Sequence, residues 1–230
     1  MSLVGAGSAP IPAVAAPRSL AASVLVPAGT IVVLIALALL PLLTPLVMHR
    51  MLDASQAPAW LGASPADTHT WSDATVRDLV LWGSFDIRGP GGTPLYGPDE
   101  VAHLGDARLL LWGLFGVAAI SAVALAARVR RSADRSGTWR GIARGGAIAA
   151  AATVVIGVVG LVAFEPLFEL FHRVFFPGGN WAFDPGSQRL VQLYPFAFWE
   201  LAAAGLGLGI IVLGAATWMV GQVMARGGRA

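Results

Sequence analysis

Two histidines in this chain have acidic residues at helical spacing and could move protons. His103 is preceded by Glu100 and followed by Asp106, while His172 is preceded by Glu169. Residues three or four apart lie on one face of a helix, so each carboxylate could orient an imidazole ring and stabilise its charged form. An imidazole with an ordinary pKa of about 6.5 suits a general base or acid at neutral pH. The spacing therefore favours acid–base chemistry over the alternative, a hydrogen bond at the membrane interface.

The same residues admit a metal site as an alternative. Glu100 with His103, and Glu169 with His172, form two Glu-x-x-His pairs, the spacing that di-iron carboxylate bundles use. Further ligands could come from Glu165 and Glu200. Such sites normally lie deep between long helices, whereas these pairs lie at helix ends. We therefore favour proton transfer and expect neither a metal nor another cofactor.

Covalent catalysis by the protein itself is not expected. The chain has no cysteine and no Gly-x-Ser-x-Gly motif, so neither a thiol nor a serine in a recognisable setting is available as a nucleophile.

Membrane helices must position these side chains, because hydrophobic residues make up 56% of the chain and charged residues only 12%. Four stretches lack Asp, Glu, Arg and His, and each is near or above the roughly 20 residues that cross a bilayer. They are residues 19–48, 109–127, 145–164 and 201–225. The first has no small-x-small cleavage site and is read as a retained anchor. The sequence predicts an all-α polytopic membrane protein with four transmembrane helices, capped by a small extracytoplasmic domain from two outer loops.

Arginine predicts the orientation of the spans, since all 15 basic residues of the chain are Arg. Nine of these arginines lie in three segments: before the first span, between the second and third spans, and after the fourth span. The arginines of these segments are Arg18, Arg128, Arg130, Arg131, Arg135, Arg140, Arg144, Arg226 and Arg229. By the positive-inside rule these segments are cytoplasmic, so both termini lie inside and both histidines outside. We expect the arginines to contact anionic lipid, not nucleic acid.

The predicted spans divide the chain into membrane and non-membrane segments. In chain order they are a disordered leader (1–18), a first span (20–48), an outer loop (49–105), a second span (107–127), a cytoplasmic loop (128–144), a third span (145–165), an outer loop (166–195), a fourth span (197–225) and a tail (226–230). Ser72 is expected to cap an amphipathic helix that ends near Gly83. Pro98 is expected to start a helix that runs into the second span, and Pro166 to kink the third.

Two stretches of the outer loops carry distinctive motifs. The first is Leu95-Tyr-Gly-Pro-Asp-Glu-Val-Ala-His-Leu-Gly-Asp-Ala-Arg108. The second, which is more specific, is Phe171-His-Arg-Val-Phe-Phe-Pro-Gly-Gly-Asn-Trp-Ala-Phe-Asp184 followed by Leu193-Tyr-Pro195. Together with the four-span layout and the large first outer loop, they resemble the Lit family of lipoprotein intramolecular transacylases.

The resemblance implies an activity and a site. The activity is transfer of the sn-2 acyl chain of a diacylglyceryl lipoprotein to the α-amine of its own N-terminal cysteine, which gives the lyso form. The family's two outer-face catalytic histidines carry over to His103 and His172, with His172 expected to act as the base. Orienting or substrate-binding roles are expected for Glu100, Asp106, Arg108, Glu169, Arg173, Asn180, Trp181, Asp184 and Tyr194. The implied location is the bacterial plasma membrane, with a diacylated lipoprotein and membrane lipid as partners and a monomer favoured.

A non-catalytic scaffold is the competing hypothesis. In it, the aromatic outer loops of a four-span protein bind a partner protein, and neither His103 nor His172 is required for function.

Overall fold

The computed structural model describes residues 20–132 and 134–227, which are almost entirely helical. Within this part of the chain, four helices are long and apolar enough to cross a membrane. They are α1 (Leu20–Leu39), extended by the 3₁₀ helix η1 (Leu40–Leu43), and α5 (Pro98–Arg131), α6 (Arg135–Phe175) and α8 (Phe196–Gly227). The predicted leader over 1–18 and the last residues of the predicted tail lie outside the described residues.

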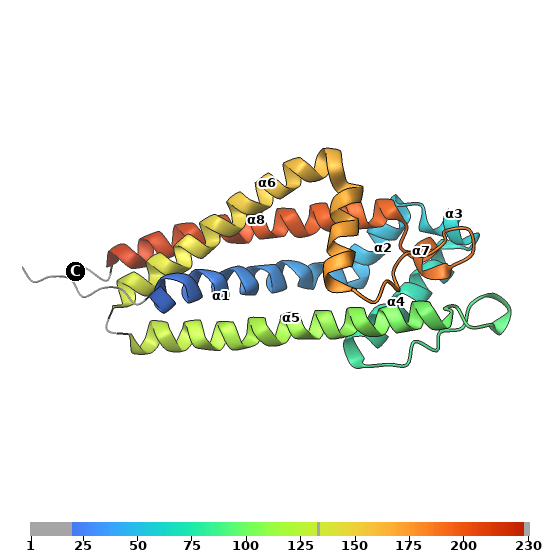
Figure 1. Ribbon diagram of the computed structural model, residues 1–230, viewed down its shortest axis with the longest axis horizontal. Coiled ribbons are helices and arrows are strands. Elements are labelled where there is room, and N and C mark those ends of the chain that lie inside the picture. Colours follow the sequence, from blue (N-terminus) through green and yellow to red (C-terminus); the bar gives the residue numbers. More distant parts are fainter. Residues whose placement is uncertain (1–19, 133, 228–230) are drawn as a thin grey trace, which may run out of the picture.

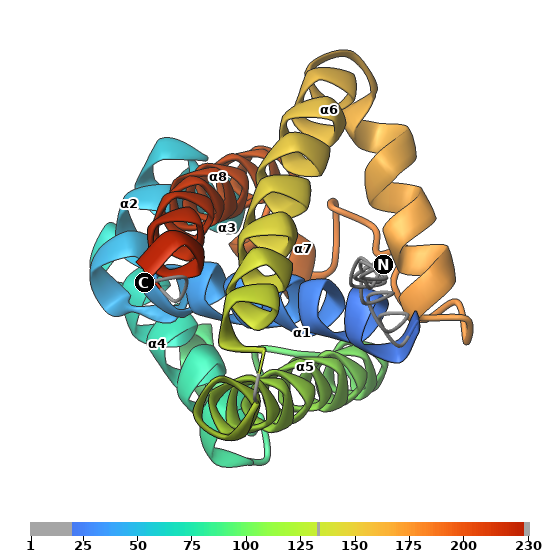
Figure 2. The same cartoon turned by 90° about the vertical axis from the view of Figure 1, so that its left-hand side faces the viewer.

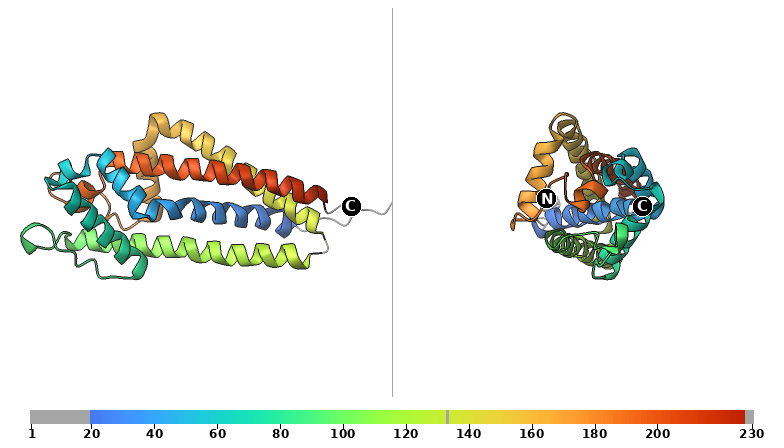
Figure 3. Two further views of the ribbon diagram at one scale, coloured as in Figure 1. Left: turned by 180° about the vertical axis from the view of Figure 1, so that it is seen from behind. Right: turned by 90° about the vertical axis from the view of Figure 1, so that its right-hand side faces the viewer.

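The shorter helices gather at one end of this bundle (Figure 1). They are α2 (Pro45–Ala54), α3 (Ala57–Leu61), α4 (Pro65–Leu81), η2 (Pro90–Gly92) and α7 (Arg189–Leu193). An apolar core joins them to the adjoining ends of α5 and α8, and its most enclosed members are Leu52, Ala57 and Leu193, all 0% exposed. Seen from behind, α5, α1 and α8 run side by side away from this end (Figure 3).

Close contact between α6 and α8 depends on two glycines. A Cβ atom added to Gly146 would lie 2.6 Å from the carbonyl oxygen of Gly214, and one added to Gly214 would lie 2.7 Å from the carbonyl oxygen of Gly146. Small residues allow helix backbones to approach in this way in membranes. Gly146 and Gly214 therefore allow the backbones of α6 and α8 to touch at this point.

A kink divides α6 into two parts. Ala163 has non-helical backbone angles (φ −141°, ψ 38°) and lies just before Pro166. Proline lacks an N–H group, and its ring clashes with the carbonyl four residues earlier, so the predicted kink has its usual cause. After the kink, residues 164–175, hereafter the α6 arm, run back across the bundle toward α5 (Figures 1 and 2). The arm brings His172 close to His103, which lies in α5.

The helix starts are partly as expected. Gly97 caps α5 and Pro98 is its first residue, which confirms that prediction. The prediction for Ser72 is wrong, because α4 already begins at Pro65, where the Ser64 hydroxyl accepts a hydrogen bond from the Asp67 N–H. A proline in the first turn and a capping hydroxyl one residue earlier make a stronger start signal than Ser72 does.

Candidate functional site

His103 and His172 face each other at the end of the bundle where the short helices lie. His103 is in the first turns of α5, and His172 is near the end of the α6 arm. Their ring centroids are 6.0 Å apart, and the ring planes are inclined by 23°. The structure therefore brings together the two side chains that the sequence singled out for proton transfer.

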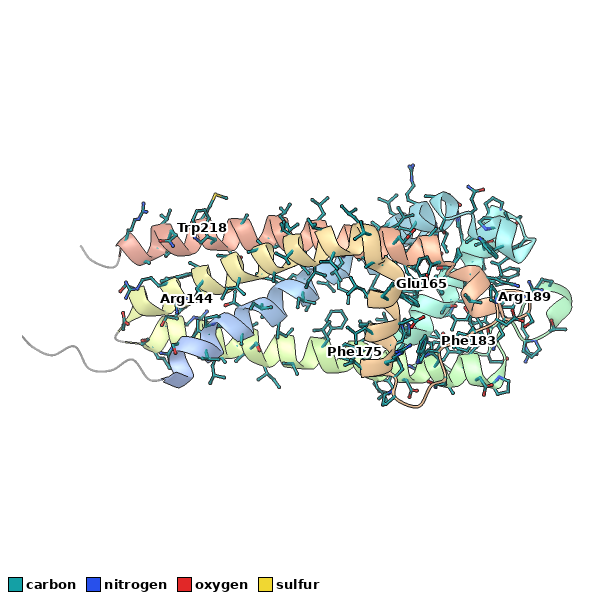
Figure 4. All side chains as sticks on the ribbon, turned by 45° about the horizontal axis from the view of Figure 1, so that its top comes forward. Arg144, Glu165, Phe175, Phe183, Arg189 and Trp218 are labelled. Atoms are coloured by element: carbon teal, nitrogen blue, oxygen red, sulfur yellow. The ribbon has the colours of Figure 1, made fainter. Side chains whose placement is uncertain are left out.

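Aromatic rings surround this pair. Phe176 lies 4.5 Å from His103 and 5.5 Å from His172, measured between ring centroids. Phe183 stands edge-on to His103 at 5.5 Å, and Trp181 lies 5.0 Å from His172. In Figure 4, Phe183 lies beside the α6 arm, on the side of the short helices. Such a lining suits a site that receives apolar chains and restricts water.

The hydrogen bond of His172 determines which ring nitrogen can act as a base. Its Nδ1 lies 2.8 Å from the carbonyl oxygen of Phe168, one turn earlier in the arm. A carbonyl oxygen can only accept, so Nδ1 carries a proton, and in the neutral ring Nε2 has the free lone pair. Glu169, expected to orient this ring, instead accepts a 2.7 Å hydrogen bond from Arg173. The backbone, not a carboxylate, orients His172.

The environment of His103 also differs from the expectation. Its Nδ1 is buried and has no hydrogen-bond partner among the described residues. Glu100, expected to hold the ring, accepts hydrogen bonds of 2.6 Å from the N–H groups of Gly97 and Leu190. With both carboxylate oxygens engaged, Glu100 fixes the start of α5 against α7. It positions His103 only through the helix that they share.

Asp106 connects α5 to the loop that follows the α6 arm. Its carboxylate accepts a 3.0 Å hydrogen bond from the Asn180 side-chain amide. Asp184, another predicted site residue, closes a turn by accepting from the Ser187 hydroxyl at 2.7 Å and from the Gly186 N–H at 2.9 Å. The bond from Ser187 and then that from Gly186 lower the pKa of Asp184. Asp184 therefore shapes the loop, while Asn180 reaches the helix of His103.

Arg108 and Tyr194 serve mainly to hold neighbouring segments. Arg108 donates a 2.7 Å hydrogen bond to the Gly83 carbonyl, and its guanidinium lies 4.4 Å from the Phe85 ring centroid. Its Nε is buried without a partner among the described residues. The buried Tyr194 hydroxyl lies 3.1 Å from that of Ser72, and burial raises the pKa of Tyr194 to about 12. The phenol therefore stays protonated.

The sequence singled out Trp181 but not Phe176 or Phe183, and it did not indicate a second histidine pair. His49 and His69 stack with ring centroids 4.1 Å apart and bond to Asp73 at 2.9 Å and Asp53 at 2.8 Å, respectively. Each histidine is four residues from the acid that pairs with the other, a crossed pattern that could have suggested this contact. No group of three or more His, Cys, Asp or Glu side chains within residues 20–132 and 134–227 could hold a metal ion. The Glu-x-x-His alternative thus finds no ligand set there.

Comparison with known proteins identifies a family that part of the chain resembles. Residues 94–199 match the family model described as "Lipoprotein intramolecular transacylase Lit". Over this range the chain is similar to the Lit family. The matched range contains both histidines and the loop between α6 and α8, and Lit transacylases are acyltransferases. No curated protein sequence matches the chain.

Solved structures extend the likeness to the whole fold. A membrane-integral Lit from Bacillus cereus covers 90% of this chain, and this chain covers 96% of it, at 14% identity and a TM-score of 0.73. Two variants of that protein, with a histidine changed to arginine or alanine, each give a TM-score of 0.61 at 15% identity. They cover 90% of this chain, and 92% and 94% of their own chains are covered. The chain therefore has the fold of an integral membrane Lit protein.

Proposed function

We propose that this protein transfers the sn-2 acyl chain of a diacylglyceryl lipoprotein to the α-amine of the N-terminal cysteine of the same molecule. The amine nitrogen attacks the ester carbonyl carbon, a C–N bond forms, and the bond from that carbon to the glycerol oxygen breaks. One amine proton leaves, and one proton ends on the glycerol oxygen. The product is an N-acylated lyso-form lipoprotein with the mass of the substrate.

The facing of His103 and His172 is the observation that carries this proposal. The Nδ1–H of His172 is held by the Phe168 carbonyl, which leaves Nε2 to accept the amine proton. His103, 6.0 Å away between centroids, donates its N–H to the carbonyl oxygen as negative charge develops. His172 then passes the proton that it accepted from the amine to the leaving glycerol oxygen, which restores both histidines. Two groups that act from either side of the carbonyl are sufficient for an O-to-N transfer.

Donor and acceptor lie on one substrate molecule, so the protein needs no nucleophile of its own. An α-amine has a pKa of about 8, so about a tenth of it is neutral at pH 7. Holding that amine against the ester supplies a high effective concentration. The rings of Phe176, Trp181 and Phe183 around the histidines limit water, which would otherwise compete with the amine for the ester.

The site is proposed to face away from the cytoplasm. Arg128, Arg130 and Arg131 lie in the last turn of α5, at the opposite end of that helix from His103. Figure 4 likewise places Arg144 far from Phe183 along the bundle. Under the positive-inside rule the arginine-rich end is cytoplasmic, so the histidines and the short helices lie on the extracytoplasmic side. Lipoproteins carry their lipidated cysteine on that side.

A synthetic lipopeptide tests this activity. The full chain in phospholipid vesicles is incubated with a diacylglyceryl-cysteine peptide, and tandem mass spectrometry locates each acyl chain. We expect one chain to move to nitrogen at unchanged total mass, while a matched peptide with an acetylated amine stays unchanged. Release of free fatty acid, or an acyl chain that stays on glycerol, would contradict the proposal.

A further inference from the structure

The two ends of the Asn180 side chain have unequal environments. Its Nδ2 donates a 3.0 Å hydrogen bond to Asp106, three residues after His103 on α5. Its Oδ1 is buried and has no hydrogen-bond partner in the part of the chain that the structure describes. A buried carbonyl oxygen without a donor is costly, so a group from outside the chain is expected to satisfy it.

Asp106 fixes the direction in which this amide points. A carboxylate only accepts hydrogen bonds, so the NH₂ end of Asn180 must face Asp106 and the oxygen must face away from it. The next residue, Trp181, packs against His172 with 5.0 Å between ring centroids. Asn180 thus lies on a segment tied to α5 close to His103 at one point and to His172 at the next.

Few groups of the proposed substrate can donate to this oxygen. The ester and thioether groups of a diacylglyceryl cysteine have no hydrogen to donate, whereas its neutral α-amine has two N–H groups and a lone pair. The lone pair must point at the ester carbon, and one N–H must point at His172 Nε2. The remaining N–H requires an acceptor of its own.

We propose that Asn180 Oδ1 accepts this remaining N–H and so holds the α-amine between His172 and the ester. This role rests on the proposed O-to-N transfer and makes Asn180 a specificity determinant for primary amines. Asp106 is the positioning residue that keeps the oxygen turned toward the substrate. The peptide N–H after the cysteine is the competing donor, and the experiment distinguishes it from the amine.

The experiment pairs removal of the acceptor with removal of one amine N–H. Initial transfer rates are measured at pH 9, where the amines are mostly neutral, for a primary-amine lipopeptide and its N-methyl counterpart. They are compared in the wild type, Asn180→Leu and Asp106→Ala. Leucine has nearly the shape of asparagine but no acceptor, so any steric penalty from the methyl group is retained. Asp106→Ala keeps Oδ1 but removes the carboxylate that orients it.

We expect Asn180→Leu to slow transfer to the primary amine about 10- to 100-fold, the cost of one buried hydrogen bond. N-methylation should slow the wild type by about tenfold or more, slow Asp106→Ala by a smaller factor, and have little further effect on Asn180→Leu. If N-methylation slows Asn180→Leu and the wild type by the same factor, Asn180 Oδ1 does not accept the amine N–H, and the proposed role is overturned. This outcome is expected both if Oδ1 binds the peptide N–H and if it binds no substrate donor. If the wild type moves no acyl chain to the primary amine, the proposed function itself fails, and the inference fails with it.

Discussion

The carboxylate of Glu100 accepts a 2.6 Å hydrogen bond from the backbone N–H of Leu190, which ties the start of α5 to the start of α7. The other oxygen of the same carboxylate binds the Gly97 N–H. Glu100 is 3% exposed, so few water molecules could replace either bond. Since α5 carries His103 and α7 follows the loop of Asn180, this carboxylate sets the distance between two sides of the site.

Glu100→Gln should therefore destabilise the protein and slow the reaction together. The amide would turn its NH₂ group toward one of the two backbone N–H donors and leave it unsatisfied, at a cost of about 1–3 kcal/mol. The expected result is a thermal midpoint lowered by several degrees, measured on the full chain in detergent. Asp99→Asn, in the same turn but exposed, is the matched control. Equal midpoints for Glu100→Gln and the wild type would contradict this assignment.

Packing of the bundle is tested by alanine at two glycines of the same helix. Gly146→Ala places a Cβ 2.6 Å from the Gly214 carbonyl oxygen, a contact between two backbones that only a shift of α6 or α8 can relieve. Overpacking of this kind costs about 1–3 kcal/mol or more. Gly157→Ala, which meets nothing within 4 Å, should be neutral or slightly stabilising. Thermal unfolding of the two variants in the same detergent decides between these outcomes, and similar midpoints would refute the close approach.

The pH dependence of transfer should follow the substrate amine. Only the neutral amine attacks the ester, and the neutral fraction increases as pH rises toward the amine pKa of about 8. Below that value the initial rate should increase about tenfold per pH unit, and above it the rate should level off. Initial rates between pH 6 and 9 with the primary-amine lipopeptide provide the measurement. A rate that falls over this range would mean that the amine does not attack as the free base.

The fold was largely predictable because hydropathy is a strong local signal. The apolar stretches predicted four membrane helices, and residues 20–132 and 134–227 contain four of membrane length. Proline gave the start of α5 at Pro98 and the kink before Pro166. The start of α4 was misassigned because Ser72 precedes an acidic residue and an apolar stripe, as a capping residue does. Its hydroxyl is instead buried against Tyr194, far away in the sequence.

The sequence singled out the two histidines that face each other, but it did not indicate the contacts around them. Glu100 and Glu169 have the spacing to reach His103 and His172, yet each forms a different hydrogen bond. Spacing along one helix cannot reveal that Leu190 or Arg173 competes for a carboxylate. The contact between Asn180 and Asp106 depends on the angle of the α6 arm after Ala163, which no local pattern encodes.

The proposed transfer is tested most sharply by its rate after replacement of each facing histidine by glutamine, a polar side chain of similar size that does not take up a proton. His103→Gln and His172→Gln should each lower the rate about 100-fold or more while the chain stays folded. His69→Gln, in the other histidine pair, should retain the wild-type rate. Transfer to nitrogen at the wild-type rate in both His103→Gln and His172→Gln would show that these histidines do not perform the reaction.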